Sequence, residues 1–265
     1  MIDHHVHTTF SFDGKQTLQA ACQAAMEAGL TGLVITDHVD TGISWKGSDF
    51  SIADPAAYRA AIEQAKADFP RLSLLRGMEL GYTPSGKKQA LAYYEAIEPE
   101  VMLGSVHVVQ GIDPYEQRYF ELHGREKGYR LYLEQLLEGL EWMHDRIQVV
   151  SHLDYVTKFA PYPDSELHYE DYPREVDDLL RLTIGYDLCL EVNTSTLAKR
   201  GTPLPGPSIL KRYHDLGGRR LTLGSDAHNS DRLGEGFAQM AGLLRQLGFT
   251  SLIQFTQEGE QQLAL

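Results

Sequence analysis

The chain begins with a histidine-rich stretch whose spacing is typical of a metal site. Residues 3–7 read Asp-His-His-Val-His, and Asp13 follows a short distance later. If residues 2–7 form a β-strand, the alternation of side chains directs His5 and His7 to the same face. Two imidazoles on one face are a metal-ligand geometry, although a histidine-rich start is also typical of a tag remnant or a solvated terminus. Matching ligands at later strand ends would decide between these interpretations.

Ligand-type residues do follow most of the later predicted strands. Short apolar runs at 32–36, 72–79, 101–107, 147–151, 188–193 and 220–224 predict buried parallel strands. Their ends and the opening stretch carry His5, His7, Asp13, His38, Glu79, His107, His152, Asp226 and His228. Six of the eleven histidines are in this set, which is more than chance placement predicts. The other histidines, His4, His123, His144, His168 and His214, are expected to be structural.

Helical patterns separate these strands, and the alternation predicts an α/β barrel. Helices are expected at 18–29, 54–69, 87–97, 126–143, 172–186, 208–216 and 236–247, with a last strand at 251–255. Longer loops are expected at 39–53, 108–124, 155–168 and 194–207, and the loop at 108–124 is a candidate lid. About seven strand–helix units predict a closed or nearly closed barrel, with the site at the carboxyl ends of its strands. We expect one domain over residues 1–265.

Composition excludes several other classes of protein. The 265 residues contain no apolar run of the roughly 18 residues that a membrane span needs, and no signal peptide, so a soluble cytoplasmic protein is expected. Cys22 and Cys189 lack CxxC partners and are expected to be core residues, not a disulfide. A net charge of −13 disfavours binding to nucleic acid or anionic lipid. The oligomeric state is left open.

The ligand types restrict the metal. Imidazole and carboxylate without thiolate suit Zn, Mn or Fe, and not Ca or an iron–sulfur cluster. The candidate set exceeds the roughly four ligands of one zinc ion, so two or three divalent ions are expected. A carboxylate such as Glu79 can bridge two of them. Such a cluster activates water near neutral pH and holds the oxygens of a phosphate.

These residues also resemble a known family. The motifs are His5-Val6-His7-Thr8 with Ser11 and Asp13, Thr36-Asp37-His38, Gly77-Met78-Glu79, Gly104-Ser105-Val106-His107, Ser151-His152-Leu153-Asp154 and Gly224-Ser225-Asp226-Ala227-His228. They resemble the successive motifs of the PHP (polymerase and histidinol phosphatase) superfamily. The size, Asp13 where some members carry histidine, and Glu191-Val192-Asn193-Thr194-Ser195 resemble the histidinol-phosphate phosphatases. The resemblance implies a distorted (β/α)7 TIM-like barrel of the PHP type, a trinuclear metal site and hydrolysis of L-histidinol phosphate in histidine biosynthesis.

The resemblance also implies roles for single residues. One ion would be held by His5, His7, Glu79 and Asp226, a second by Asp13, His38 and His228, and a third by Glu79, His107 and His152. Asp226, His228 and Asp154 are expected to be catalytic, with Asp154 orienting a bound histidine or meeting the cationic part of the substrate. An Asp or His at the rim would protonate the leaving alcohol.

Three basic residues in loops after strand ends are expected to bind the substrate phosphate. They are Lys158, Lys199 and Arg200. Thr196 stands where the family pattern Asn-Thr-Ser-Gly-Leu has glycine, which is a departure within the substrate loop.

Other functions stay open at this point. The chain could be a PHP phosphoesterase acting on a nucleotide, a sugar phosphate or phosphotyrosine. A non-catalytic metal-binding domain is a second alternative, although the complete ligand set speaks against it. A two-metal amidohydrolase is a third, but it usually has a lysine after its fourth strand, where this chain has Ser105-Val106-His107.

Overall fold

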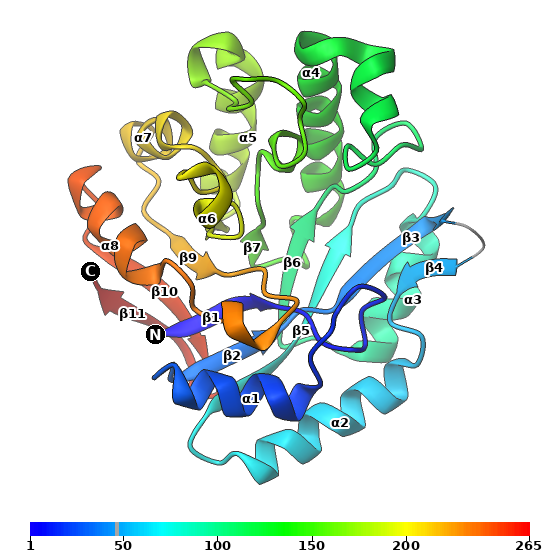
Figure 1. Cartoon of the computed structure of the whole chain (residues 1–265), viewed down its shortest axis with the longest axis vertical. Helices are drawn as coiled ribbons and strands as arrows, with labels where there is room; N and C mark the ends of the chain where they lie inside the picture. The colour runs from blue at the N-terminus through cyan, green and yellow to red at the C-terminus, as the bar shows by residue number, and fades with distance from the viewer. Residues whose placement is uncertain (46–47) are drawn as a thin grey trace.

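Seven parallel strands form a nearly closed barrel in the computed structural model, which describes residues 1–45 and 48–265 (Figure 1). Their order is β1 (Ile2–Val6), β2 (Gly32–Ile35), β5 (Ser73–Gly81), β6 (Val101–Ser105), β7 (Val149–Val150), β8 (Cys189–Asn193) and β9 (Leu221–Gly224). Every neighbouring pair in this order is parallel. The predicted distorted (β/α)7 barrel is therefore confirmed.

The first and last strands of this order meet through a narrow seam. The His7 amide donates to the Ala227 carbonyl at 3.0 Å, and the Ala227 amide donates to the His5 carbonyl at 3.4 Å. The Gln16 side-chain amide donates to the carbonyls of both His7 (2.8 Å) and Ala227 (3.0 Å). This closure brings the opening histidines beside the segment that carries Asp226 and His228.

Helices surround the barrel (Figure 1). They are α1 (Leu18–Glu27), α2 (Pro55–Asp68), α3 (Lys87–Ile97), α4 (Gln117–Met143), α5 (Pro173–Gly185), α6 (Leu197–Arg200), α7 (Pro207–Asp215) and α8 (Phe237–Gln246), with 3-10 turns η1 (Tyr155–Thr157), η2 (Tyr169–Asp171) and η3 (Ser230–Arg232). The Asp54 carboxylate caps α2 by accepting from the amides of Ala56 and Ala57 at 3.0 Å, as its position before Pro55 predicts. No helix in the described ranges has the length and apolar character needed to cross a membrane.

The prediction of a loop at 39–53 was wrong for most of its length. Strands β3 (His38–Trp45) and β4 (Ser48–Ser51) form an antiparallel pair there, and residues 46 and 47 lie outside the described part of the chain. Strand β5 extends to Gly81, and its extension pairs in parallel with β3. Because this pairing satisfies the hydrogen-bonding groups of the backbone, a polar segment can form a strand without an alternating apolar pattern.

The predicted loop at 108–124 was wrong at its end, because α4 begins at Gln117. Gly124 (φ 70°) interrupts the helix with a kink. Tyr119 and Phe120 are buried in this first segment, and the Tyr119 hydroxyl donates to the Gly128 carbonyl at 2.6 Å. Packing across the kink therefore stabilises helix in a segment whose composition indicates a loop.

A C-terminal hairpin covers the amino-terminal end of the barrel. Strand β10 (Ser251–Thr256) was predicted, but its antiparallel partner β11 (Gly259–Ala264) was not. Apolar residues from six barrel strands pack together with Ile253 of β10 in one cluster: Ile2, Val34, Leu75, Val101, Leu103, Val149 and Cys189. Cys22 and Cys189 are both buried and unpaired, as expected. His4 contacts the backbone through both ring nitrogens, the Leu223 carbonyl at 3.2 Å and the Phe255 amide at 3.1 Å, so it has a structural role here.

We predict that Asp3→Ala destabilises the fold by about 2–4 kcal/mol, because it leaves buried donors without an acceptor. The buried Asp3 carboxylate accepts from the Ser225 amide (2.9 Å), the Ser225 hydroxyl (2.5 Å) and the Gly234 amide (2.9 Å), so it joins β1 to the segment after β9. Urea unfolding measures the change. Asp178→Ala on the exposed side of α5 is the control, and an equal effect of the two substitutions would contradict the anchoring role.

Candidate metal centre

All nine predicted ligand residues lie at the carboxyl ends of the barrel strands. Four groups have ligand atoms within 4.8 Å of one another: His5, His7 and Asp226; His5, Glu79 and His152; His38, Glu79 and His107; and His7, His38 and His228. Asp13 reaches the last of these groups from the loop after β1. The structure thus assembles one continuous cluster from residues that span positions 5 to 228.

The first part of the cluster is a set of electron-pair donors that converge on one point. The Nε2 atoms of His5 and His7 lie 3.0 Å apart. Asp226 Oδ1 lies 3.8 Å and 3.4 Å from these two nitrogens, and Glu79 Oε2 lies 3.3 Å and 3.6 Å from them. Such a convergence of lone pairs inside a protein is stabilised by a cation or by protons.

Glu79 faces two ligand groups at once. Its Oε1 lies 2.8 Å from His152 Nε2 and 3.2 Å from His107 Nε2, and its Oε2 lies 3.0 Å from His38 Nδ1. The side chain is fully buried, and neither Glu79 Oε2 nor His38 Nδ1 forms a hydrogen bond with the described residues. A carboxylate in this position can bridge two metal ions.

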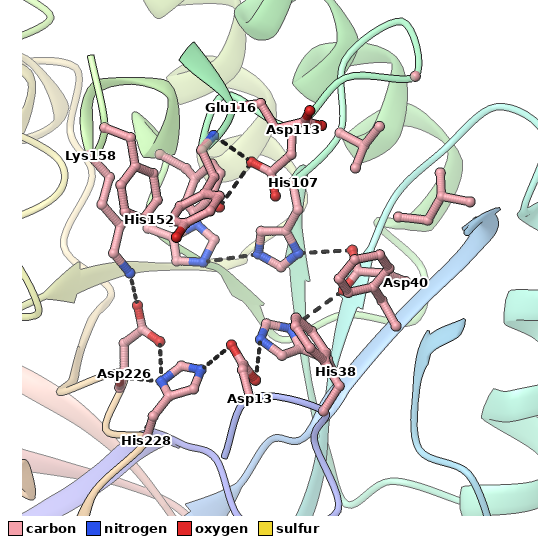
Figure 2. Close-up of a pocket in the computed structure, with 18 of the residues that line it drawn as sticks. Asp13, His38, Asp40, His107, Asp113, Glu116, His152, Lys158, Asp226 and His228 are labelled. Atoms are coloured by element: carbon pink, nitrogen blue, oxygen red, sulfur yellow. Dashed lines mark hydrogen bonds and ion pairs between the residues drawn. The ribbon is translucent and has the colours of Figure 1, made fainter. Parts of the chain in front are cut away.

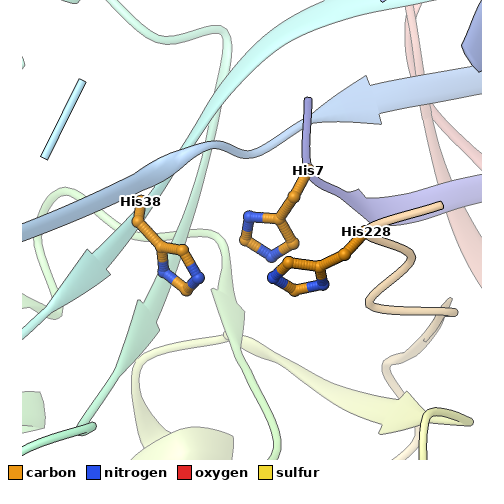
Figure 3. A group of neighbouring side chains, drawn as sticks. All are labelled: His7, His38 and His228. Atoms are coloured by element: carbon orange, nitrogen blue, oxygen red, sulfur yellow. The ribbon is translucent and has the colours of Figure 1, made fainter. Parts of the chain in front are cut away.

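Three imidazoles lie together at the outer part of the cluster (Figure 3). The ring of His7 stacks with those of His38 and His228, each at a centroid distance of 4.2 Å. Asp13 Oδ2 lies 3.0 Å from His228 Nε2, and Asp13 Oδ1 lies 3.8 Å from His38 Nε2. Asp13 therefore has the position that its motif predicts, next to two histidines from distant segments.

Two further carboxylates orient the ligand histidines. Glu191 Oε1 lies 2.7 Å from His5 Nδ1, and Asp40 Oδ1 lies 2.8 Å from His107 Nδ1. When each Nδ1–H donates to its carboxylate, the Nε2 lone pair faces the cluster, which is the usual arrangement of metal-binding histidines. Neither residue has a predicted role in the sequence pattern. A charged residue within the apolar strand 188–193 indicates a functional role for Glu191. Asp40 offers no such indication, because it lies in a segment predicted to be a loop.

Another carboxylate holds the loop that carries Asp13. Asp37 accepts from the amide and hydroxyl of Thr8, both at 2.7 Å, and from the amide (3.0 Å) and hydroxyl (2.6 Å) of Ser11. These four hydrogen bonds tie the loop after β1 to the end of β2. They restrict the positions that Asp13 can take.

The electrostatics of the cluster also favour a cation. Burial by itself lowers the pKa of His5, but the carboxylates of Glu191, Glu79 and Asp226 offset this effect, and the pKa lies well above its usual range. In the same way, burial lowers and the carboxylates of Asp40 and Glu79 raise the pKa of His107, to about 10. Positive charge thus stabilises this site, and metal ions would replace protons there. The donor types and the unpaired Glu79 Oε2 fit divalent transition-metal ions.

A cavity of about 580 Å³ opens beside the cluster (Figure 2). Its ligand-type lining is Asp13, His38, His107, His152, Asp226 and His228, and its aromatic lining is Phe12, Phe50, Tyr115, Tyr155 and Phe159. The Lys158 ammonium also lines it and lies 2.6 Å from Asp226 Oδ2. The cavity can therefore receive a small anionic molecule next to the cluster.

Three predicted site residues belong neither to the cluster nor to the lining of this cavity. The buried Asp154 carboxylate accepts from the Gly206 amide at 3.3 Å, because η1 begins directly after it and the chain turns away. The Arg200 guanidinium donates to the carbonyl (2.8 Å) and hydroxyl (3.1 Å) of Thr157. Lys199 lies exposed on α6. Of the predicted phosphate-binding cations, the structure brings only Lys158 into the cavity.

We predict that Glu191→Gln lowers metal content and activity by about 10–100-fold, because Glu191 sets the tautomer of His5 and also accepts from the His152 amide at 2.7 Å. Metal content after gel filtration, measured by mass spectrometry, tests this. Glu170→Gln, on the exposed turn η2, is the matched control. Unchanged metal content in Glu191→Gln would remove this carboxylate from the site.

Known proteins with similar sequences and folds place the chain in a family. Residues 3–195 match the PHP domain model. A probable histidinol-phosphatase of Clostridium acetobutylicum is 30% identical and covers 89% of this chain and 90% of its own length. A histidinol-phosphatase of Lactococcus lactis is 26% identical and covers 96% of this chain and 94% of its own length.

Fold comparison agrees with the sequence matches. A crystal structure of histidinol phosphate phosphatase from Lactococcus lactis, complexed with zinc, L-histidinol and phosphate, is 24% identical, covers 98% of each chain and has a TM-score of 0.85. The chain therefore belongs to the PHP family and, within it, to the histidinol-phosphatase group.

Proposed function

We propose that the chain is a metal-dependent phosphomonoesterase that hydrolyses L-histidinol phosphate to L-histidinol and phosphate in histidine biosynthesis. The observation that carries this proposal is the buried cluster around Glu79, which lies next to a cavity lined by Lys158, whose ammonium is paired with Asp226 at the edge of the cluster. The relatives named histidinol-phosphatases, matched along nearly the whole chain, support the substrate. We treat residues 1–265 as one catalytic domain, because the C-terminal hairpin packs on the barrel.

The proposed centre holds three divalent ions, of zinc, manganese or iron. One is assigned to His5, His7, Glu79 and Asp226, a second to Asp13, His38 and His228, and a third to Glu79, His107 and His152, on the basis of the pair distances within each set. Zinc in the Lactococcus lactis protein supports this metal class. When bound, such ions polarise the phosphate and supply an activated water.

The chain's own residues have separate proposed tasks. Lys158 binds a phosphate oxygen, because its ammonium reaches the cluster edge at Asp226. Asp226 and His228 line the cavity beside the phosphate position. Burial raises the pKa of Asp226, but Lys158 and His5 hold it well below its usual range, so this carboxylate can accept the proton of the attacking water, and His228 can transfer one to the leaving alcohol. Asp154 acts outside the cavity by holding the segment after His152 to Gly206.

We predict that the protein reconstituted with zinc or manganese hydrolyses L-histidinol phosphate with a kcat/KM at least about 10-fold above that for p-nitrophenyl phosphate, because the cavity recognises the leaving group. A panel that includes a nucleotide, a sugar phosphate and phosphotyrosine measures this preference, and chelation of the metal should abolish all turnover. A preference for another ester, or none, would contradict the proposed substrate.

The metal requirement is checked with His107→Ala, which removes a ligand, and with His144→Ala on the end of α4 as the control. Loss of activity and metal in the first variant only is expected. Full activity in His107→Ala would exclude the cluster from catalysis. Metal binding without turnover in the unmodified protein would instead indicate a non-catalytic metal-binding domain.

We predict that Lys158→Ala raises the KM for every phosphomonoester by about 10–100-fold, because a charge-assisted contact to the phosphate is lost. Inhibition by inorganic phosphate should weaken by a similar factor. Lys199→Ala is the matched control, since this lysine lies outside the cavity on α6. If Lys199→Ala gave the larger effect, the phosphate would be bound from the loop after β8 and not by Lys158.

A further inference from the structure

The cavity has two chemically different ends (Figure 2). Asp13, Asp226 and His228 lie at one end, and His107 and His152 of the cluster lie between this end and the other. Asp113 and Glu116 lie at the other end, on the segment between β6 and α4. A molecule that fills this cavity with its phosphate at the cluster therefore places its leaving group toward these two carboxylates.

The two carboxylates at this end differ in their partners. Glu116 is paired with the Arg118 guanidinium at 2.7 and 3.1 Å, so its charge is neutralised. Asp113 has no such cation among the described residues. Its Oδ1 accepts both of its hydrogen bonds, from the Tyr115 amide (2.7 Å) and the Tyr155 hydroxyl (3.3 Å), which leaves Oδ2 without a donor in the part of the chain described.

Tyr155 sets the separation between Asp113 and the cluster. Its ring lies 5.0 Å from the ring of His107 and 5.2 Å from that of His152, while its hydroxyl contacts Asp113. Asp113 and the two cluster histidines therefore contact the same tyrosine. A phosphate ester with a second charged group near the ester oxygen can reach both the cluster and Asp113.

The walls between the two ends are apolar and aromatic. Phe12 and Phe50 meet edge to face at a centroid distance of 4.4 Å, and Phe159 lies beside Tyr155 at 5.9 Å. Such walls contact the aliphatic or ring carbons of a ligand and lower the local dielectric constant. Burial raises the pKa of Asp113 to about 6, so the carboxylate is ionised at neutral pH but poorly solvated, and a ligand cation would stabilise it.

We propose that Asp113, held by Tyr155, is the specificity-determining residue that binds the cationic nitrogen of the leaving alcohol. The ligand class is a small phosphomonoester that carries an ammonium or imidazolium group. This inference rests on the proposed function and identifies which part of the cavity selects the substrate. It disfavours sugar phosphates, whose leaving groups carry no cation for Asp113.

The test compares one substitution on two substrates. Asp113→Asn keeps the shape of the side chain and removes its charge. For L-histidinol phosphate we expect kcat/KM to fall by about 10–100-fold, mainly through KM, because a charge-assisted hydrogen bond is lost. For p-nitrophenyl phosphate, whose leaving group has no cation, we expect less than about a threefold change. The second substrate also shows that the variant is folded and loaded with metal.

Glu116→Gln is the matched control, because it removes a carboxylate at the same end that already has Arg118 as its partner. An equal loss of kcat/KM for L-histidinol phosphate in both variants would show that the total negative charge of this end selects the substrate, and would overturn the role of Asp113. Equal losses on both substrates in Asp113→Asn would indicate a structural role and also overturn it. If the unmodified protein hydrolysed p-nitrophenyl phosphate but not L-histidinol phosphate, the proposed substrate would be wrong. If Asp113→Asn kept the substrate preference of the unmodified protein, only the role of Asp113 would be wrong.

Discussion

The site depends on the contacts of a single buried carboxylate, that of Glu79, with the surrounding histidines. Its two oxygens lie within 3.3 Å of nitrogens from His5, His38, His107 and His152, which come from four separate segments. Burial would raise the pKa of an isolated glutamic acid, but the histidines hold the pKa of Glu79 well below its usual range. A charge removed from water in this way requires compensating positive charge. The barrel therefore has to keep these segments in register.

Other buried carboxylates provide that register. Asp3 joins the first strand to the segment after β9, Asp37 holds the loop that carries Asp13, and Asp40 and Glu191 fix the rings of two cluster histidines. Each accepts hydrogen bonds from groups that would otherwise be buried without partners. Part of the acidity of the chain is thus structural and lies around the site, not on the surface.

The cavity combines two kinds of recognition. The end of the cavity with the cluster and Lys158 is suited to the phosphate of any phosphomonoester. The other end carries the carboxylates of Asp113 and Glu116 and is reached between aromatic side chains. Separating the two functions along one cavity means that substitutions at one end should affect all substrates, and those at the other end should affect only some of them. Specificity can then change with the segment after β6 while the metal ligands stay the same.

The sequence by itself determined which residues meet in the cluster and most of the barrel. Apolar strands with ligand-type residues at their ends are a local pattern, and the convergence of parallel strand ends at one face makes that pattern sufficient to predict that His5, Glu79 and His228 meet. Only the tertiary structure decided that β3 is a strand, that Lys158 and not Arg200 enters the cavity, and that Asp113 lines the cavity at the end away from Asp13 and Asp226. These features depend on where loops turn and which polar partners they find, and those contacts join residues far apart in the chain, so local propensity does not encode them.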